Sequence, residues 1–347
     1  MTAALLNFYS DRNVGDAAIL ASLRSMLRAT RLPALGLDDR AAAERADLLI
    51  SVGGDIFNNG RPGLVTRRFI GKTRQLAWAP ERTVLFGQSI PPSCDGVALR
   101  LLARRLRRIA SVTVRDDESA RKLAGQGVTA TVSPDTAFAL TRDDADFAAA
   151  RAAYFHQGLA AETTALFSVR SFNRMYPAST EGYVARLAET MRLLNASNWR
   201  VAVLLQADVD ACDGDRAMIE ALRAEVPGLA VIDPFAHGDT PWRTALGAVA
   251  MAGTVIGTRY HTAIFGMIAG RAPVSLWYSN KGEDLGRRFA LPGASADAFD
   301  PARIAALARD HAGAGFDPAP VRRQVRADFA SAIAAIPDRA ARRTSAA

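Results

Sequence analysis

The sequence has only two cysteines, at positions 94 and 212, and neither belongs to a Cys-x-x-Cys pair or another spacing typical of zinc ligands. This scarcity excludes a disulfide framework and fits a reducing compartment, so a cytoplasmic protein is expected. The four histidines lie far apart along the chain. We therefore predict no local metal cluster and expect no bound metal.

Long apolar runs are absent as well. No stretch of about 18 apolar residues occurs, so the sequence predicts no membrane-spanning helix. Residues 1–9 lack a basic start and are expected to form a strand rather than a signal peptide. With 347 residues, 49% of them hydrophobic and 22% charged, the composition is that of a globular protein with room for two domains.

Lysine is also scarce, occurring only at positions 72, 122 and 281, so arginine carries nearly all of the positive charge behind a net charge of +8. A basic excess suits acidic substrates or an anionic membrane surface. No nucleic-acid-binding motif with interleaved aromatic residues accompanies it, so nucleic acid is not an expected partner.

Apolar runs typical of strands alternate with amphipathic stretches typical of helices, which predicts parallel sheets joined by crossover helices. The expected strands are residues 3–9, 46–52, 83–87, 111–114, 130–133, 164–169, 200–205, 229–232, 254–257 and 273–277. The predicted fold class is therefore α/β.

Two domains account for this alternation. Residues 1–145 form the first and residues 155–300 the second, and a charged, alanine-rich segment near residues 142–153 interrupts the pattern between them. Helices over residues 301–337 follow, and residues 338–347 are expected to be a disordered tail. Two Rossmann-like, doubly wound parallel sheets in this order resemble the GT-B architecture of glycosyltransferases.

Polar residues follow the predicted strands of the first domain. They are Asn13, Gly15 and Asp16 after the first strand, Gly53, Gly54 and Asp55 after the second, Gln88 and Ser89 after the third, and Asp135 after the fifth. Because ligands of open parallel sheets bind at the carboxyl ends of the strands, we predict one site at this edge. Glycines allow close backbone approach, and carboxylates can deprotonate a hydroxyl. The alternatives are that these residues only form turns between the elements, and that Asp16 only caps a helix.

The second domain carries an arginine directly after its first strand. Arg170 follows the buried run at residues 165–169. A buried guanidinium requires an anionic partner, because an unpaired buried charge is costly. That partner is either an anionic ligand or a carboxylate of the facing domain.

The strongest motif is the Gly-Thr-Arg-Tyr-His segment at residues 257–261, which leads from a β-branched strand into a helix. The free N–H groups and positive end of that helix, together with the guanidinium of Arg259, favour a phosphate or carboxylate ligand. His261 adds a group that exchanges a proton near neutral pH. A core histidine beside a structural arginine is the alternative. Lys281, after the last strand, either supplies another positive charge or is simply exposed.

Eight short motifs in register resemble the polysaccharide pyruvyl transferase family. They are residues 13–16, 51–55, 87–90, 114–119, 134–135, 168–170, 257–261 and 278–281. The resemblance covers residues 7–291. It implies a fold similar to GT-B and the transfer of pyruvate from phosphoenolpyruvate onto two hydroxyls of one sugar, with a cyclic ketal and phosphate as products. The chain departs from the family pattern at Gly53–Gly54, where the glycine run is often fuller, and at Tyr260, where an aliphatic residue is common.

The resemblance also implies roles for the site residues. The donor phosphoenolpyruvate would be held by Arg170, Gly257, Thr258, Arg259, Tyr260, His261 and Lys281. The sugar acceptor would be held by Asn13, Gly15, Asp16, Gly53, Gly54, Asp55, Gln88, Ser89 and Asp135. We expect His261 to transfer the proton and Asp16 or Asp55 to act as the base. No cofactor or metal is required, because the arginines neutralise the phosphate.

A basic segment at residues 101–109 places arginines among leucines. It fits an acceptor on a lipid carrier, in exopolysaccharide or cell-wall biosynthesis, with peripheral contact to the inner membrane surface. A solvated helix face is the alternative. Two other functions remain open on this architecture: a GT-B glycosyltransferase or nucleotide-sugar epimerase, and an inactive scaffold of a polysaccharide-assembly complex. The sequence carries no signal for the oligomeric state.

Overall fold

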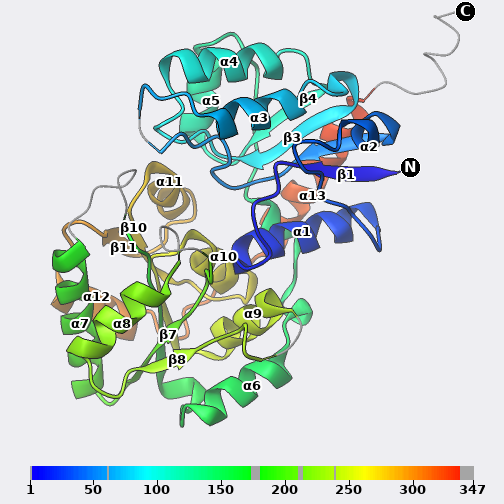
Figure 1. Cartoon of the computed structure of the whole chain (residues 1–347). Helices are drawn as coiled ribbons and strands as arrows, with labels where there is room; N and C mark the ends of the chain where they lie inside the picture. The colour runs from blue at the N-terminus through cyan, green and yellow to red at the C-terminus, as the bar shows by residue number, and fades with distance from the viewer. Residues whose placement is uncertain (1, 61, 173–179, 210–213, 238–239, 337–347) are drawn as a thin grey trace, which may run out of the picture. The chain divides into compact units, whose positions relative to one another are not determined.

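The computed structural model describes residues 2–60, 62–172, 180–209, 214–237 and 240–336, which form two compact α/β units (Figure 1). The first unit falls within Met1–Tyr9, Ile19–Ala139 and Pro320–Ala347. The second falls within Ser10–Ala18 and Leu140–Ala319. Cys212 and the expected tail at residues 338–347 lie outside the described residues.

The sheet of the first unit has five parallel strands in the order β1-β2-β3-β4-β5. They are β1 (Ala3–Leu6), β2 (Leu48–Ser51), β3 (Thr83–Gln88), β4 (Ser111–Val114) and β5 (Thr131–Val132). On the other side of β1, Leu5 forms a parallel bridge with Ala34. The chain therefore crosses first to one side of β1 and then to the other, so the switch point of this doubly wound sheet lies between β1 and β2.

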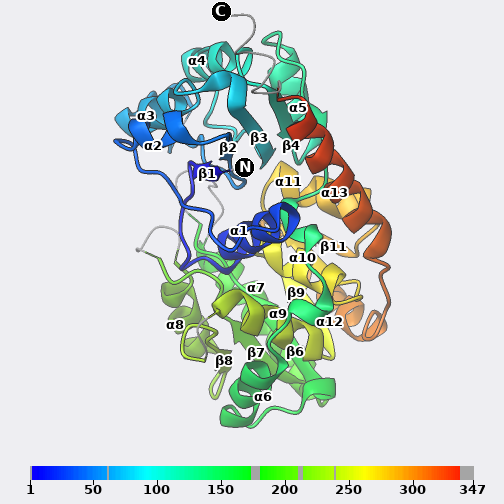
Figure 2. The same ribbon diagram turned by 90° about the vertical axis from the view of Figure 1, so that its right-hand side faces the viewer.

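Helices pack on both faces of this sheet. They are α1 (Val14–Leu27), α2 (Arg40–Arg45), α3 (Arg67–Gln75), α4 (Gly96–Leu106), α5 (Asp117–Ala124) and α13 (Ala319–Ala334), with 3₁₀ turns at Pro80–Arg82 and Thr136–Ala139. Leu85 of β3 shares a core with Phe69 of α3 and Leu102 of α4. Its neighbour Phe86 points to the opposite face, as alternate strand residues do. There its ring lies 5.0 Å from that of Phe329 in α13, the red helix of Figure 2.

The second unit has six parallel strands in the order β11-β10-β9-β6-β7-β8. They are β6 (Thr164–Ser168), β7 (Arg200–Leu204), β8 (Ala230–Ile232), β9 (Thr254–Gly257), β10 (Val274–Trp277) and β11 (Gly293–Ser295). The order reverses between β6 and β9, as in the Rossmann arrangement, so the switch point lies between these two strands.

The remaining helices belong to the second unit. They are α6 (Phe147–His156), α7 (Thr180–Ala196), α8 (Arg216–Glu225), α9 (Pro241–Met251), α10 (Tyr260–Ile268), α11 (Asn280–Arg288) and α12 (Pro301–Asp310), with 3₁₀ turns at Arg142–Asp144 and Ala161–Thr163. Phe167 of β6, Met191 of α7 and Leu222 of α8 are fully or almost fully buried in one core. This core fixes the carboxyl ends of the central strands, where the candidate residues lie.

The α/β class with two parallel-sheet, Rossmann-like units is confirmed. Four helices or strands were not expected: α2, α6, α11 and β11. Helix α6 occupies the segment expected to interrupt the pattern, and Asp146 caps it by accepting a hydrogen bond of 2.9 Å from the Ala149 N–H. In the part of the chain that the structure describes, no helix is both long and apolar enough to cross a membrane.

The two units also differ from the continuous ranges expected from the sequence. Residues 10–18 group with the second unit, although β1 and most of α1 belong to the first. Helix α13, which follows the whole second unit in the chain, returns to the first, where Arg326 donates to the Ala139 carbonyl at 2.9 Å.

Candidate functional site

One buried guanidinium gathers three predicted site residues at the carboxyl edge of the first sheet. Arg115 follows β4, and its side chain is 1% exposed. Its Nη1 donates to Asp135 Oδ2 at 2.7 Å and its Nε to Ser89 Oγ at 2.7 Å. Its Nη2 lies 3.4 Å from Asp55 Oδ1. The structure thus brings Asp55, Ser89 and Asp135 together, as their positions after successive parallel strands predict.

The members of this Arg115 cluster have different access to solvent. Asp135 is buried, and its Oδ1 also accepts a hydrogen bond of 2.9 Å from the Ala137 N–H, so it holds Arg115 in place. Ser89 Oγ donates to Asp116 Oδ2 at 2.6 Å. The Asp55 side chain is 15% exposed. Asp55 is therefore the carboxylate of this cluster that can meet a ligand.

Gly53, Gly54 and Gln88 also lie at the carboxyl edge of the first sheet. Gly54 has a φ of 91°, and a Cβ built on Gly53 would lie 2.9 Å from the Gly87 carbonyl oxygen. Gln88 is fully buried, and its Nε2 donates to the Val52 carbonyl. Gln88 therefore links β3 to the end of β2, and its expected contact with an acceptor stays a prediction.

Asn13, Gly15 and Asp16 group with the second unit, although they follow β1 of the first sheet. The backbone of residues 12–14 runs along the segment that follows β7. The Val14 N–H donates to the Gln206 carbonyl at 2.9 Å, and Asn13 forms an antiparallel bridge with Ala207.

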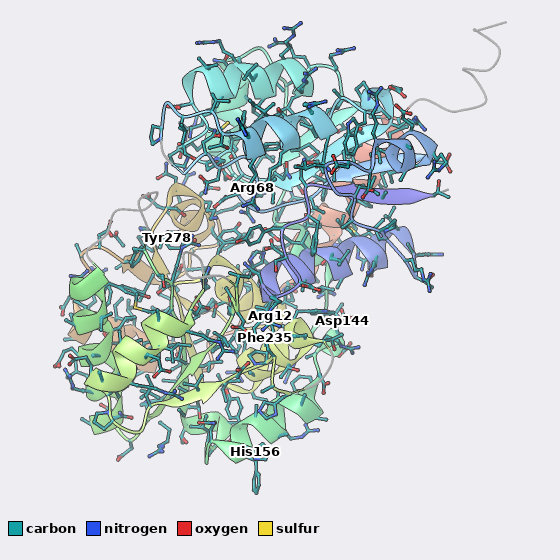
Figure 3. The ribbon with its side chains drawn as sticks, viewed as in Figure 1. Arg12, Arg68, Asp144, His156, Phe235 and Tyr278 are labelled. Atoms are coloured by element: carbon teal, nitrogen blue, oxygen red, sulfur yellow. The ribbon has the colours of Figure 1, made fainter. Side chains whose placement is uncertain are left out.

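Side chains reinforce this attachment. Arg12 forms an ion pair with Asp208, and its guanidinium lies 5.4 Å from the centroid of the Phe235 ring (Figure 3). Hydrogen bonding to Arg216 and Arg12 lowers the pKa of Asp208. Asp208 therefore stays ionised, and paired with both arginines, near neutral pH.

Asn13, rather than Asp16, caps the first helix. Its Oδ1 accepts a hydrogen bond of 3.0 Å from the Gly15 N–H, and α1 begins at Val14. Asp16 is the third residue of the helix and is almost buried. A negative charge in the first turn interacts favourably with the positive end of the helix dipole.

His261 lies directly against the backbone of Gly15. A Cβ built on Gly15 would lie 2.5 Å from Cγ of His261 and closer still to Nδ1, so the fit depends on the absence of a side chain at residue 15. The His261 ring contacts Tyr260 edge-on, with centroids 5.6 Å apart. Lys281 Nζ lies 5.7 Å from the Tyr260 ring centroid. The structure thus groups His261, Tyr260 and Lys281 with the loop at residues 13–16.

This contact gives a stability prediction. Gly15→Ala is expected to lower the free energy of unfolding by about 1 to 3 kcal/mol, because the added methyl group must displace the His261 ring. Gly125→Ala is the matched control, since the nearest atom would be 3.6 Å from the new Cβ. Urea unfolding of both variants measures the difference. Equal stability of the two would show that His261 moves aside freely.

Arg259 is paired within the second unit. Its Nε donates to Asp215 Oδ1 at 2.9 Å, and its Nη2 donates to the same oxygen. Asp215 is fully buried, and its Oδ2 accepts hydrogen bonds from the Gln206 N–H at 2.9 Å and the Ala207 N–H at 3.0 Å. Complete burial raises the pKa of Asp215, and Arg259 offsets part of that rise. The charge of Arg259 is therefore compensated by a carboxylate that the sequence analysis did not identify.

These bonds connect the 257–261 turn to the loop that carries Gly15. Gln206 donates its N–H to Asp215 and accepts from Val14 through its carbonyl. One hydrogen-bonded chain thus runs from Arg259 through Asp215 and Gln206 to Val14. This chain of hydrogen bonds thereby keeps Gly15 and His261 in contact.

Arg170 and the 257–261 turn flank the switch point of the second sheet. Gly257 pairs in register with Ser168, whose Oγ accepts a hydrogen bond of 3.1 Å from the Arg259 N–H. Thr258 Oγ1 accepts a hydrogen bond of 2.7 Å from the hydroxyl of Tyr183, a buried residue. The turn is therefore held rigidly on β6, the strand that ends next to Arg170.

Arg170 itself is stacked on an aromatic ring. Its guanidinium carbon lies 4.5 Å from the Tyr278 ring centroid, and Nη1 lies 2.7 Å from the Tyr278 hydroxyl oxygen. Tyr278 and Arg259 also line one small cavity beside the turn. Within the residues described, no three His, Cys, Asp or Glu side chains form a group able to hold a metal ion.

Three residues of these clusters have no role predicted from the sequence: Arg115, Asp215 and Tyr278. Arg115 and Tyr278 both lie in motifs that resemble the family. Arg115 also follows a buried strand, as Arg170 does, which is a signal that could have identified it. Asp215 has no local signal, since its partner is distant in sequence.

A model of the polysaccharide pyruvyl transferase family matches residues 13–280. The chain belongs to this family. The matched range contains every predicted site residue except Lys281. Both the Arg115 cluster and the Arg259–Asp215 pair therefore lie within the part of the chain that defines a polysaccharide pyruvyl transferase.

Solved structures share the fold of this pyruvyl transferase family member at low identity. HepE from Anabaena, in complex with UDP-glucose, has a TM-score of 0.59 at 11% identity, covering 95% of this chain and 100% of its own. A UDP-N-acetylglucosamine 2-epimerase assigned in Listeria monocytogenes has a TM-score of 0.58 at 9% identity, covering 93% and 90%. Staphylococcus aureus MnaA with UDP has a TM-score of 0.53 at 9% identity, covering 92% of this chain and 92% of its own. These likenesses show the GT-B-like fold alone. No curated protein sequence matches this chain significantly.

Proposed function

We propose that this protein transfers pyruvate from phosphoenolpyruvate onto two hydroxyls of one sugar of a polysaccharide or lipid-linked glycan, forming a cyclic ketal. The observation that carries the proposal is the placement of Arg170 and the 257–261 turn on either side of the β6–β9 switch point, in a member of this family. Ligands of doubly wound sheets bind at such points.

The donor is a compact trianion, so its site needs fixed positive charge. Arg170 is held by Tyr278, and Lys281 lies beside Tyr260. Arg259 is compensated by Asp215, so we assign it to holding the turn, with Thr258 and Gly257, at the start of α10. Arg170, Lys281 and the helix N–H groups then bind the carboxylate and phosphate.

The chemistry requires two C–O bonds to form and one to break. A proton is added to the methylene carbon of phosphoenolpyruvate, and a sugar hydroxyl attacks the adjacent carbon. The bond from that carbon to the phosphate oxygen then breaks, and a second hydroxyl closes the ring. One hydroxyl proton balances the proton gained by the methylene carbon, and the other leaves with phosphate.

Two residues are assigned to the proton transfers. His261 delivers the proton to the methylene carbon. Asp16 or Asp55 accepts the hydroxyl proton, and Asp16 is favoured because it follows Gly15, which touches His261. The reaction as written needs neither a metal nor another cofactor, since Arg170 and Lys281 neutralise the phosphate.

Phosphate release from phosphoenolpyruvate, measured with a panel of sugar and glycan acceptors, tests the function directly. Acceptor-dependent release would support it. Two of the solved neighbours, HepE and MnaA, were crystallised with UDP-glucose and with UDP, so a nucleotide-sugar enzyme is the competing function. Thermal stabilisation by a UDP-sugar, with none by phosphoenolpyruvate, would favour that alternative and contradict the proposal.

Arg170→Lys tests the donor site. We expect the Kd for phosphoenolpyruvate to rise about 10- to 100-fold, because a lysine cannot keep both the stacked plane and the forked hydrogen bonds of a guanidinium. Arg186→Lys is the matched control, since Arg186 also lies over an aromatic ring, 5.3 Å from the Phe299 centroid, and has no role in the proposed site. Isothermal titration compares the two. An unchanged Kd in Arg170→Lys would remove Arg170 from the donor site.

A further inference from the structure

The positive charge of the chain is concentrated in one short stretch. Residues 67–108 contain ten basic residues and only two acidic ones, Glu81 and Asp95, which leaves a net charge of +8. The whole chain also has a net charge of +8, so the remaining residues balance to zero. An arginine-rich composition alone would spread this excess over the molecule. The confinement of the excess charge to residues 67–108 therefore indicates a function of this part of the molecule.

Nine of these ten basic residues lie in, or directly after, two neighbouring helices of the first unit. Helices α3 and α4 contact each other and lie side by side in both ribbon views (Figures 1 and 2). Neither contains an acidic residue. Both bury one side in the core under the sheet, with Phe69 of α3 and Leu102 of α4. Their opposite sides are exposed.

The exposed sides alternate arginine with large apolar residues at helical spacing. On α4 and its C-terminal end, Val97 and Leu101 lie on the same face as Arg100, Arg104 and Arg108. On α3, Ile70 lies between Arg67 and Arg74. We call these eight residues the α3–α4 surface.

The apolar members of this surface are unusually exposed. Ile70 is 42% exposed, Val97 54% and Leu101 40%. Six large hydrophobic side chains are exposed in the described part of the chain, and three of them are these. A fourth, Leu37, contacts α3 at Gly71. A face that only needed solubility would carry acids among the arginines and fewer exposed aliphatic side chains.

We propose that the α3–α4 surface binds membranes that contain anionic phospholipid. The arginines contact the phosphate headgroups, while Ile70, Val97 and Leu101 enter the interface below them. A second copy of the chain that docked through the same surface would bring the same positive charge and be repelled. Single-stranded nucleic acid would require stacking aromatic side chains, and none of the eight residues is aromatic. The proposal does not depend on the identity of the reaction.

Vesicle co-sedimentation tests this directly. The full chain is mixed with phosphatidylcholine vesicles, with or without about one third phosphatidylglycerol, at about 0.05 M and about 0.5 M salt. We expect retention on the anionic vesicles at low salt, weaker retention at high salt, and none on phosphatidylcholine alone. Equal retention on both kinds of vesicle would overturn the proposal.

Two triple variants separate this surface from net charge. Arg100→Gln, Arg104→Gln and Arg108→Gln together should lower the vesicle partition coefficient roughly 100-fold. Arg151→Gln, Arg200→Gln and Arg303→Gln remove the same charge from exposed positions in the second unit and should bind like the parent protein. If both triple variants lose vesicle binding equally, binding depends on net charge and not on the α3–α4 surface. If short single-stranded DNA binds the parent protein and anionic vesicles do not, the partner is a nucleic acid and the proposal is wrong.

The apolar residues and the activity provide the last two readouts. Val97→Asn with Leu101→Asn should abolish the retention that survives at high salt, because only the apolar part of binding is insensitive to screening. Unchanged high-salt retention would remove the apolar residues from the contact. Phosphate release on a soluble acceptor should be the same in all these variants, so failure of membrane binding and failure of the proposed reaction remain distinguishable.

Discussion

Replacing Asp215 with asparagine is expected to lower the free energy of unfolding by about 3 to 5 kcal/mol. The substitution keeps the size of the side chain and removes only its charge. It leaves the guanidinium of Arg259 buried opposite a neutral group, and an uncompensated buried charge is far more costly than the loss of a whole ion pair. It also weakens the acceptor for the Gln206 and Ala207 N–H groups. Urea denaturation followed by circular dichroism measures the change.

Asp208→Asn is the control for this variant. Asp208 also pairs with arginines, but its Arg12 and Arg216 partners are well exposed, so a change of no more than about 1 kcal/mol is expected. Combining Asp215→Asn with Arg259→Gln should recover part of the lost stability, because the buried charge is then gone. A small loss of stability in Asp215→Asn alone would show that other groups balance the charge of Arg259.

His261→Ala is expected to lower kcat for phosphate release by about 10²- to 10⁴-fold, the usual contribution of a positioned proton-transfer group. The Kd for phosphoenolpyruvate should change little, because Arg170 and Lys281 bind the donor. Folding should be retained, since the His261 side chain lies at the partly exposed start of α10 and its removal leaves the Arg259–Asp215 pair in place. Steady-state kinetics and donor titration measure the two effects separately.

The control for His261 is another histidine of the same unit. His156 stacks on His237, with ring centroids 5.6 Å apart, on an exposed helix end. His156→Ala should leave both kcat and the donor Kd unchanged. Normal turnover in His261→Ala would contradict the assigned proton transfer. A large loss of donor affinity in that variant would instead make His261 a binding residue.

The strands were largely predictable because burial on both sides of a parallel sheet leaves short runs of β-branched and aliphatic residues. All ten expected strands are present, and Ser111–Val114 and Thr254–Gly257 have the expected bounds. Strand β11, with the sequence Gly-Ala-Ser, and the bridge at Ala34 have no such run. Their pairing is decided by neighbouring strands rather than by their own composition, so the sequence could not reveal them.

The candidate site was predictable where it follows strand order. Asp55, Ser89 and Asp135 come after successive strands of one sheet and do meet, around Arg115. The loop at residues 13–16 follows β1 in the same way, yet backbone hydrogen bonds to residues 206–208 attach it to the second unit. Backbone bonds leave no mark on residue types, so strand order alone could not reveal this attachment.

The pairing of side chains that are distant in the sequence was also not predictable. The sequence indicates that a buried arginine such as Arg259 needs a carboxylate, but it offers 35 acidic residues as partners. Asp215 is the partner because the fold brings its carboxylate next to Arg259, which follows β9, and next to the backbone that follows β7. For this reason the proposed function assigns Arg259 to positioning the turn rather than to binding the donor.

The return of α13 to the first unit has a consequence for synthesis on the ribosome. Phe86, which Phe329 covers in the finished protein, is translated long before α13 emerges. Phe86 therefore lacks this cover while the whole second unit is made. In a variant with Phe329→Ala, part of the cover would be missing from the released protein as well.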